Sequence, residues 1–207
     1  PLECVDVSAT HPEAAGWIAR GELPLMGASP DGLLVNETSG ELQVLEVKCS
    51  SPFVSTARDS TGRGGMRVSD RPGKSGVGVW HVPQLQLEML CAGPKCRAAV
   101  LVTLSAHDGA TLYQVPRDDA YIHSMLAWLR KFHITFSVLK NGSPPENFNH
   151  HAEGYDAFLA ETSRIAKSAR VVYTMPQEEV QRDVVNNDFY FFSPSPAPRP
   201  APAPRPA

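Results

Sequence analysis

The sequence predicts an α/β fold with a central mixed β-sheet flanked by helices. Two pairs of apolar runs, each pair separated by turn-forming residues, predict two hairpins. Two longer segments carry apolar residues at helical spacing and predict helices. The predicted strands are residues 27–35, 42–49, 97–105 and 111–115, and the predicted helices are residues 82–92 and 117–140. With 207 residues, 42% of them hydrophobic, the chain can bury one full core.

The first hairpin brings three charged residues together. A register symmetric about the loop 36–41 pairs Val35 with Leu42 and therefore places Asp31 opposite Glu46. Directly opposed residues of an antiparallel pair have Cβ atoms roughly 4.5–5.5 Å apart. Lys48 lies on the same face as Glu46 because side chains alternate along a strand. The hairpin is thus expected to gather two carboxylates and an ammonium group.

This cluster predicts metal-assisted hydrolysis of a phosphodiester. Two carboxylates held so close repel each other unless a cation lies between them, and hard oxygen ligands favour Mg²⁺ or Mn²⁺. Lys48 could orient or help to deprotonate an attacking water, or stabilise charge that develops on a phosphate. The alternative is a surface hairpin with an incidental Glu–Lys ion pair.

The composition of the second strand argues against that alternative. Its apolar residues occupy both faces, which predicts a strand buried on both sides, where a charge needs a partner or a purpose. These apolar residues are Leu42, Val44, Leu45 and Val47.

Three motifs in order resemble the lambda-exonuclease-like, YqaJ-type viral recombinase branch of the PD-(D/E)XK nucleases. They are Ser29-Pro30-Asp31-Gly32, Leu45-Glu46-Val47-Lys48-Cys49 and His81-Val-Pro-Gln84-Leu-Gln86-Leu-Glu-Met89. The resemblance covers roughly residues 25–140 and implies a restriction-endonuclease-like core. It also implies a Mg²⁺-dependent exonuclease that acts on double-stranded DNA in recombination or repair. Some family members form rings around DNA, so a homo-oligomer is compatible with the resemblance.

The resemblance also implies the roles of individual residues. Asp31, Glu46 and the backbone carbonyl of Val47 would bind the metal, and Lys48 would be catalytic. The active-site glutamine of the family falls on Gln84. Gln86 is about 200° away around a helix, so we expect it to make a packing or polar contact instead.

One element of the family has no clear counterpart. Relatives carry an upstream helix with a glutamate that helps to complete the active site, and the upstream glutamates here are Glu3, Glu13 and Glu22. None of them lies in a helical match to that element. The nuclease core therefore could be truncated, and a nucleic-acid-binding or assembly module without turnover is an alternative function. An endonuclease of the same superfamily is another.

Charge and composition bear on the partner. The net charge is −3, yet residues 54–79 carry five basic side chains against two acidic ones. Arg58, Arg63 and Arg67 in this glycine-rich segment are candidate DNA-phosphate contacts, and the alternative is a passive surface insertion. No apolar run is long enough for a membrane span. Four scattered cysteines predict reduced, mostly buried thiols and an intracellular protein of unknown compartment.

The remaining segments are interpreted as appendages. We expect a nuclease core at residues 1–145, a C-terminal extension at 146–192 with a helix over 155–170, and a disordered proline-rich tail at 193–207. The tail is either a linker or a ligand for a proline-recognising domain. Residues 17–19 suggest a short strand or turn. The aromatic run 189–192 is expected to dock on the core rather than to stack on bases.

Overall fold

The computed structural model describes residues 2–3, 10–50, 53–55, 66–68, 76–105, 109–138, 142–144, 149–150 and 152–179. Its strands are β1 (Leu2–Glu3), β2 (Gly27–Ala28), β3 (Gly32–Val35), β4 (Leu42–Ser50), β5 (Phe53–Ser55), β6 (Met66–Val68), β7 (Cys96–Ser105), β8 (Gly109–Pro116) and β9 (Arg170–Met175). Its helices are α2 (Pro12–Ala19), α3 (His81–Cys91), α4 (Asp119–His133) and α5 (Tyr155–Ser168), with a π-helical turn at Ile134–Val138.

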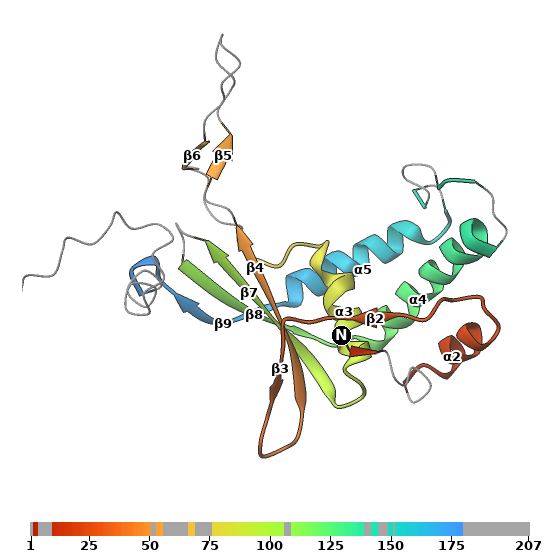
Figure 1. Cartoon of the computed structure of the whole chain (residues 1–207), viewed down its shortest axis with the longest axis horizontal. Helices are drawn as coiled ribbons and strands as arrows, with labels where there is room; N and C mark the ends of the chain where they lie inside the picture. Colours follow the sequence, from red (N-terminus) through yellow and green to blue (C-terminus); the bar gives the residue numbers. More distant parts are fainter. Residues whose placement is uncertain are drawn as a thin grey trace, which may run out of the picture.

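The centre of the fold is a five-stranded sheet in the order β3-β4-β7-β8-β9 (Figure 1). Strands β4 and β7 are parallel, and the other neighbouring pairs are antiparallel. Parallel strands need a long crossover connection, which usually contains a helix, and here it contains α3. Helices pack against this mixed sheet, so the predicted α/β class is confirmed.

The first hairpin has the register that its symmetry predicts. Val35 pairs with Leu42, and Gly32 pairs with Leu45. Asp31 directly precedes β3, so the same register places it beside Glu46 of β4. The second predicted hairpin is also present as β7 and β8, which pair from Ser105 with Gly109 onwards.

The main core lies between the sheet and helices α3, α4 and α5. Val44, Leu101 and Val115 contribute from the sheet, and Leu85 and Met89 contribute from α3. In Figure 1 the helices gather on one side of the five-stranded sheet. Side chains of the sheet that point towards the helices are therefore buried, and α3 packs next to β4.

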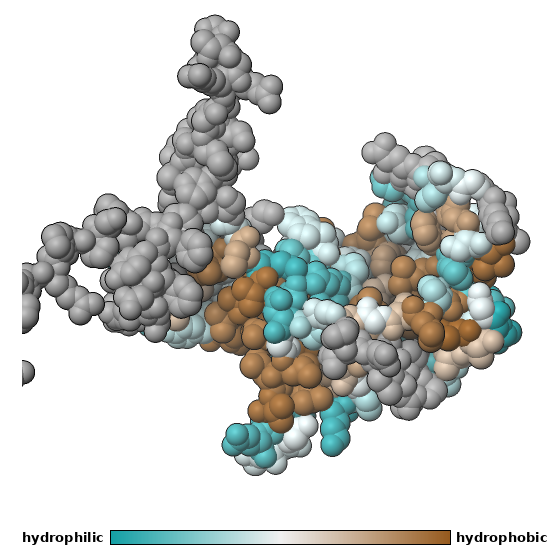
Figure 2. Space-filling view, viewed as in Figure 1, coloured by the Kyte–Doolittle hydropathy of each residue, from teal (hydrophilic) through white to brown (hydrophobic). Residues whose placement is uncertain are grey.

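The expectation that β4 is buried on both faces is wrong. Val44 and Glu46 on the helix side are buried, whereas Leu45 is half-buried and Val47 is 37% exposed. The apolar residues of the other face are covered less completely, and Figure 2 shows hydrophobic side chains exposed over β3. A buried charge is therefore present only on the helix-facing side of β4, at Glu46.

Helix α4 begins and packs as its pattern predicts over its first half. Asp118 caps it by accepting a hydrogen bond from the Tyr121 N–H at 2.9 Å. Tyr121 and Leu126 are buried, but Leu129 and Phe132 are each 39% exposed. The predicted apolar stripe is therefore core only in its first turns.

Residues 17–19 belong to a helix, not to a strand or turn. Pro12 occupies the first turn of α2, where its missing N–H costs nothing. Ala14 and Trp17, three residues apart, are both buried and pack in a cluster with Ile122 of α4. The helix is short, and its apolar face is recognisable only beside its partner helix.

Several predicted features lie outside the described residues or are described only in part. Arg58, Arg63, the aromatic run 189–192 and the tail 193–207 lie outside. Arg67 belongs to β6, which pairs with β5 in a separate two-stranded sheet, and its side chain is not described. Among the described helices, none has the length and apolarity needed to cross a membrane.

Candidate active site

Asp31 is held against the backbone of β4. Its Oδ2 accepts a hydrogen bond from the Val47 N–H at 2.7 Å, although the side chain is largely exposed. In an antiparallel pair, the N–H and C=O of one residue point to the same edge of the strand. The Val47 carbonyl therefore faces the same edge of β4 as Asp31.

Glu46 and Lys48 form an ion pair on the helix-facing side of β4. The Nζ of Lys48 donates a hydrogen bond to Oε1 of Glu46. The Glu46 side chain is 6% exposed and that of Lys48 is 35% exposed. The ammonium group thus neutralises a buried carboxylate and still reaches solvent, where a substrate could meet it.

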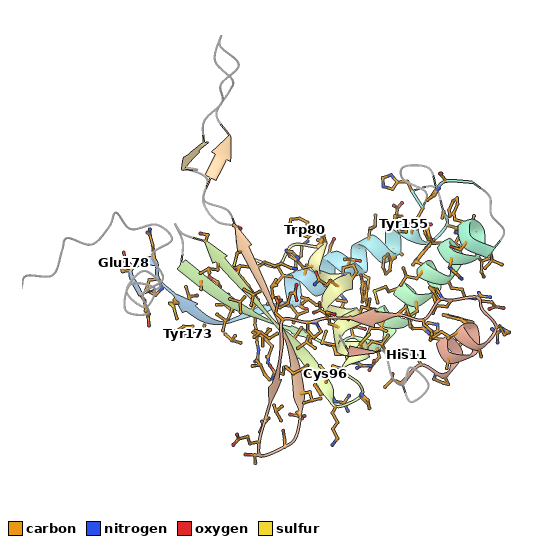
Figure 3. The ribbon with its side chains drawn as sticks, viewed as in Figure 1. His11, Trp80, Cys96, Tyr155, Tyr173 and Glu178 are labelled. Atoms are coloured by element: carbon orange, nitrogen blue, oxygen red, sulfur yellow. The ribbon has the colours of Figure 1, made fainter. Side chains whose placement is uncertain are left out.

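Gln84 approaches this pair from α3. Its Nε2 donates a hydrogen bond to Oε1 of Glu46 at 2.7 Å. Leu85 and Met89 pack α3 on the sheet, which holds Gln84 over β4. Figure 3 labels Trp80 at the N-terminal end of the same helix, one turn from Gln84. The glutamine is exposed, so its amide lies at the surface of the site.

Gln86 turns away from the site, as its position on the helix predicts. It is fully buried. Its Nε2 donates to the Pro116 carbonyl at 2.9 Å, and its Oε1 accepts from the Asp118 N–H at 3.0 Å. The polar contact expected of this residue is therefore made with the connection between β8 and α4.

The structure adds Glu88, which sequence reasoning missed. Gln84 Nε2 donates a second hydrogen bond to Oε1 of Glu88 at 2.8 Å. Glu88 is only 2% exposed, and its Oε2 has no hydrogen-bond partner among the described residues. The available signal was a glutamate four residues after Gln84 on an otherwise apolar helix face, which is one turn away on the same side.

Burial dominates the ionisation of Glu88. Desolvation raises the pKa of its carboxyl to about 7, the hydrogen bond from Gln84 opposes the shift, and the nearby charge of Glu46 adds to it. Lys48 acts in the lowering direction and Asp31 in the raising direction. Glu88 therefore belongs electrostatically to the same cluster as the three residues from the hairpin.

This raised pKa predicts a pH-dependent stability of the metal-free protein. Below the ordinary value of 4.5, Glu88 is protonated in both the folded and unfolded states, and above about 7 the folded state carries a buried charge. The free energy of unfolding should thus fall between pH 4.5 and 7, by on the order of 3 kcal/mol. Urea unfolding across this range in the presence of a chelator measures the effect.

Two variants separate Glu88 from other carboxylates in that experiment. Glu88→Gln removes the titrating group and should flatten the dependence over this range. Glu37→Gln removes an exposed carboxylate at the far end of the first hairpin and should retain it. A Glu88→Gln profile as steep as that of the parent would contradict the assignment.

The upstream glutamates that the structure describes fully do not reach this cluster. Glu13 of α2 lies 3.6 Å from His123, and Glu22 pairs with Arg20 and with Arg130 of α4. Glu3 belongs to β1, which pairs with β2. Among the described side chains, the carboxylate that joins the hairpin residues therefore comes from α3, within the third motif.

The thiols are consistent with the sequence interpretation where they are described. Cys91 and Cys96 are buried, Cys49 is exposed, and all three are free. Cys4 lies outside the described residues. Within the described ranges, no three His, Cys, Asp or Glu side chains are arranged so that they could together hold a metal ion. The oxygen donors at the hairpin are thus two side chains and one backbone carbonyl.

The arrangement places carboxylate oxygens, one ammonium group and one amide close together. Asp31 and Glu46 supply hard oxygen atoms of the kind that Mg²⁺ and Mn²⁺ prefer, and Glu88 has a buried oxygen without a partner. Lys48 supplies a positive charge, and Gln84 supplies an amide at the surface. The chain matches no protein-family model, and neither a curated protein nor a solved structure matches it significantly.

Proposed function

We propose that the chain is a Mg²⁺-dependent DNA nuclease with a restriction-endonuclease-like core, similar to the lambda-exonuclease-like branch of the PD-(D/E)XK nucleases. One observation carries the proposal. The hairpin delivers Asp31 to the β4 segment that carries Glu46 and Lys48, while Gln84 reaches the same Glu46 from α3. Four residues from three separate motifs thus meet at one place.

The residues of the site fit a magnesium or manganese ion by their chemistry. Asp31, Glu46 and the carbonyl of Val47 would hold it, since all three are oxygen donors at one stretch of β4. The ion would supply Lewis-acid stabilisation of the scissile phosphate and lower the pKa of a bound water. Two adjacent carboxylates with a single neighbouring ammonium group retain negative charge that favours a cation.

The protein groups around these oxygens have separate tasks in the proposed reaction. Lys48, partly exposed, would orient the attacking water or stabilise the charge that develops on the phosphate. Gln84 would position the nucleophile, because its amide lies at the surface of the site. The hydrogen bond from Gln84 would keep the Glu46 side chain in place.

The substrate follows from the motifs rather than from the site geometry. The resemblance supports double-stranded DNA ends in recombination or repair, with DNA as the partner and exonucleolytic cleavage as the activity. The chemistry of the site is shared by exonucleases and endonucleases. The channel that surrounds the site would decide between them.

Incubation of the protein with end-labelled linear DNA and with covalently closed circular DNA tests this function. We expect the linear substrate to be degraded in Mg²⁺ and the circular one to remain, with neither cut when a chelator is present. Cleavage of both would indicate an endonuclease. DNA that is retarded in a gel but intact under all conditions would contradict nuclease activity and favour a binding module.

A further inference from the structure

The amide of Gln84 is held between two carboxylates. Its Nε2 donates to Oε1 of Glu46 and to Oε1 of Glu88, at 2.7 and 2.8 Å. A primary amide has two N–H donors on that nitrogen, an ionised carboxylate can only accept, and Glu88 offers an acceptor oxygen whether it is ionised or protonated. Both donors are therefore used, and the amide cannot be flipped without placing its oxygen against two carboxylate oxygens.

This double contact also determines where the amide oxygen points. The carbonyl oxygen of a primary amide lies on the side opposite to its nitrogen. With the nitrogen directed towards Glu46 and Glu88, the Gln84 oxygen faces away from both carboxylates. The side chain is exposed, and its oxygen has no donor among the described residues.

A single carboxylate would hold this amide less well. The terminal torsion of glutamine is broad, without the three sharp wells of saturated torsions. With Glu46 alone, one hydrogen bond would remain and water would compete for the second N–H. Glu88 removes this freedom because it lies one turn further along the same helix, directly beneath Gln84.

A glutamate at position 88 lowers the stability of the fold if it has no role beyond the fold. It is 2% exposed and one of its oxygens has no partner among the described residues. A buried polar atom without a hydrogen bond destabilises the folded state. The neighbours Leu85 and Met89 on the same helix show that an apolar side chain suits this face.

We infer that Glu88 is a positioning residue, which fixes the Gln84 amide so that its oxygen accepts a hydrogen bond from the water that attacks the phosphate. The catalytic consequence rests on the proposed function, whereas the orientation of Gln84 does not. Glu88 contacts neither the substrate nor the reacting atoms in this role. It acts only by accepting the hydrogen bond that Gln84 Nε2 donates.

The orientation is tested by the side-chain amide signals of ¹⁵N-labelled protein, with Gln84 assigned through Gln84→Ala. We expect both Gln84 amide protons to be shifted downfield and to exchange slowly in the parent protein. In Glu88→Leu one of the two should return towards the position of a free amide. Glu88→Gln keeps an acceptor oxygen and should retain the parental pattern.

The same spectra contain an internal control. The amide of Gln86 is buried and bonded to the Pro116 carbonyl, so its signals should stay in place in both variants if the helix is intact. Unchanged Gln84 signals in Glu88→Leu would overturn the inference. A matching loss of both proton shifts in Glu88→Gln would also overturn it.

Turnover at saturating DNA provides the second measurement. Glu88→Leu should lower kcat by about 10²-fold, the cost of a misplaced catalytic group, and Glu88→Gln should recover most of that loss. Equal losses in the two variants would show that the charge of Glu88 matters and not its hydrogen bond, which contradicts positioning. If the parent cleaves no DNA, the proposed function fails and the spectra alone decide the inference.

Discussion

Glu46→Gln is expected to abolish Mg²⁺-dependent cleavage of DNA. The substitution removes the negative charge that a divalent cation needs, but its amide oxygen can still accept the hydrogen bond that Gln84 donates. Asp31→Asn should have the same effect, since its side-chain oxygen can still accept from the Val47 N–H. A radiolabelled or fluorescent DNA assay across a range of Mg²⁺ concentrations measures the loss.

The fold should survive both substitutions. Neither variant opens a cavity. Asp31→Asn should leave the stability of the metal-free protein equal to that of the parent or higher, whereas Glu46→Gln loses the ion pair with Lys48 and should lower it without unfolding the protein. Glu37→Gln, an exposed substitution in the loop of the same hairpin, is the matched control and should cleave as the parent does. Cleavage by Glu46→Gln or Asp31→Asn at the parental rate in Mg²⁺ would show the metal-site assignment to be wrong.

Lys48→Met is expected to lower turnover by about 10²–10⁴-fold, the usual range for a positioned acid, base or charge-stabilising group. The methionine retains most of the aliphatic stem but removes the ammonium group that bonds to Glu46. DNA binding should change little, because one positive charge contributes a small part of the total phosphate contact. Single-turnover kinetics together with a binding titration separate these two effects.

Two further variants define the role of Lys48. Lys48→Arg should recover only part of the activity, since a guanidinium is wider and does not release its proton. Lys95→Met is the control for charge loss. Lys95 directly precedes β7 and lies near Leu42, at the end of β4 that is distant from Lys48. Lys48→Met should also lose some thermal stability, because it leaves the buried Glu46 carboxylate without its ion pair. If DNA binding is lost in proportion to turnover, the lysine holds the hairpin and takes no part in the chemistry.

The hairpin was the most predictable part of the structure. The turn-forming loop 36–41 between two apolar runs predicts a register symmetric about it, which pairs Leu33 with Val44. A slip by one residue would move every side chain to the other face. The placement of Gln84 was predictable for a related reason. Helical spacing separates it from Gln86, and only one of the two can face β4.

Other features depended on contacts between distant segments. Helix α2 is eight residues long, and its burial depends on α4, more than a hundred residues away in the chain. Strand β9 was not predicted, and it pairs with the edge of β8, more than fifty residues earlier in the chain. In the sequence, Glu88 cannot be distinguished from other charged residues on helices. Its burial follows from the packing of α3 on the sheet.

The contacts of Gln86 have a mechanical consequence for the active site. A helix packed only through Leu85 and Met89 could rotate about its axis by a few degrees at little cost, since apolar contacts have no direction. The hydrogen bond that Gln86 donates to Pro116 and the one that it accepts from Asp118 are directional, and they lie on the side of α3 away from Gln84. They set the rotational angle of the helix, and because Gln84 projects from the same rigid backbone, the junction of β8 and α4 determines where its amide stands above Glu46.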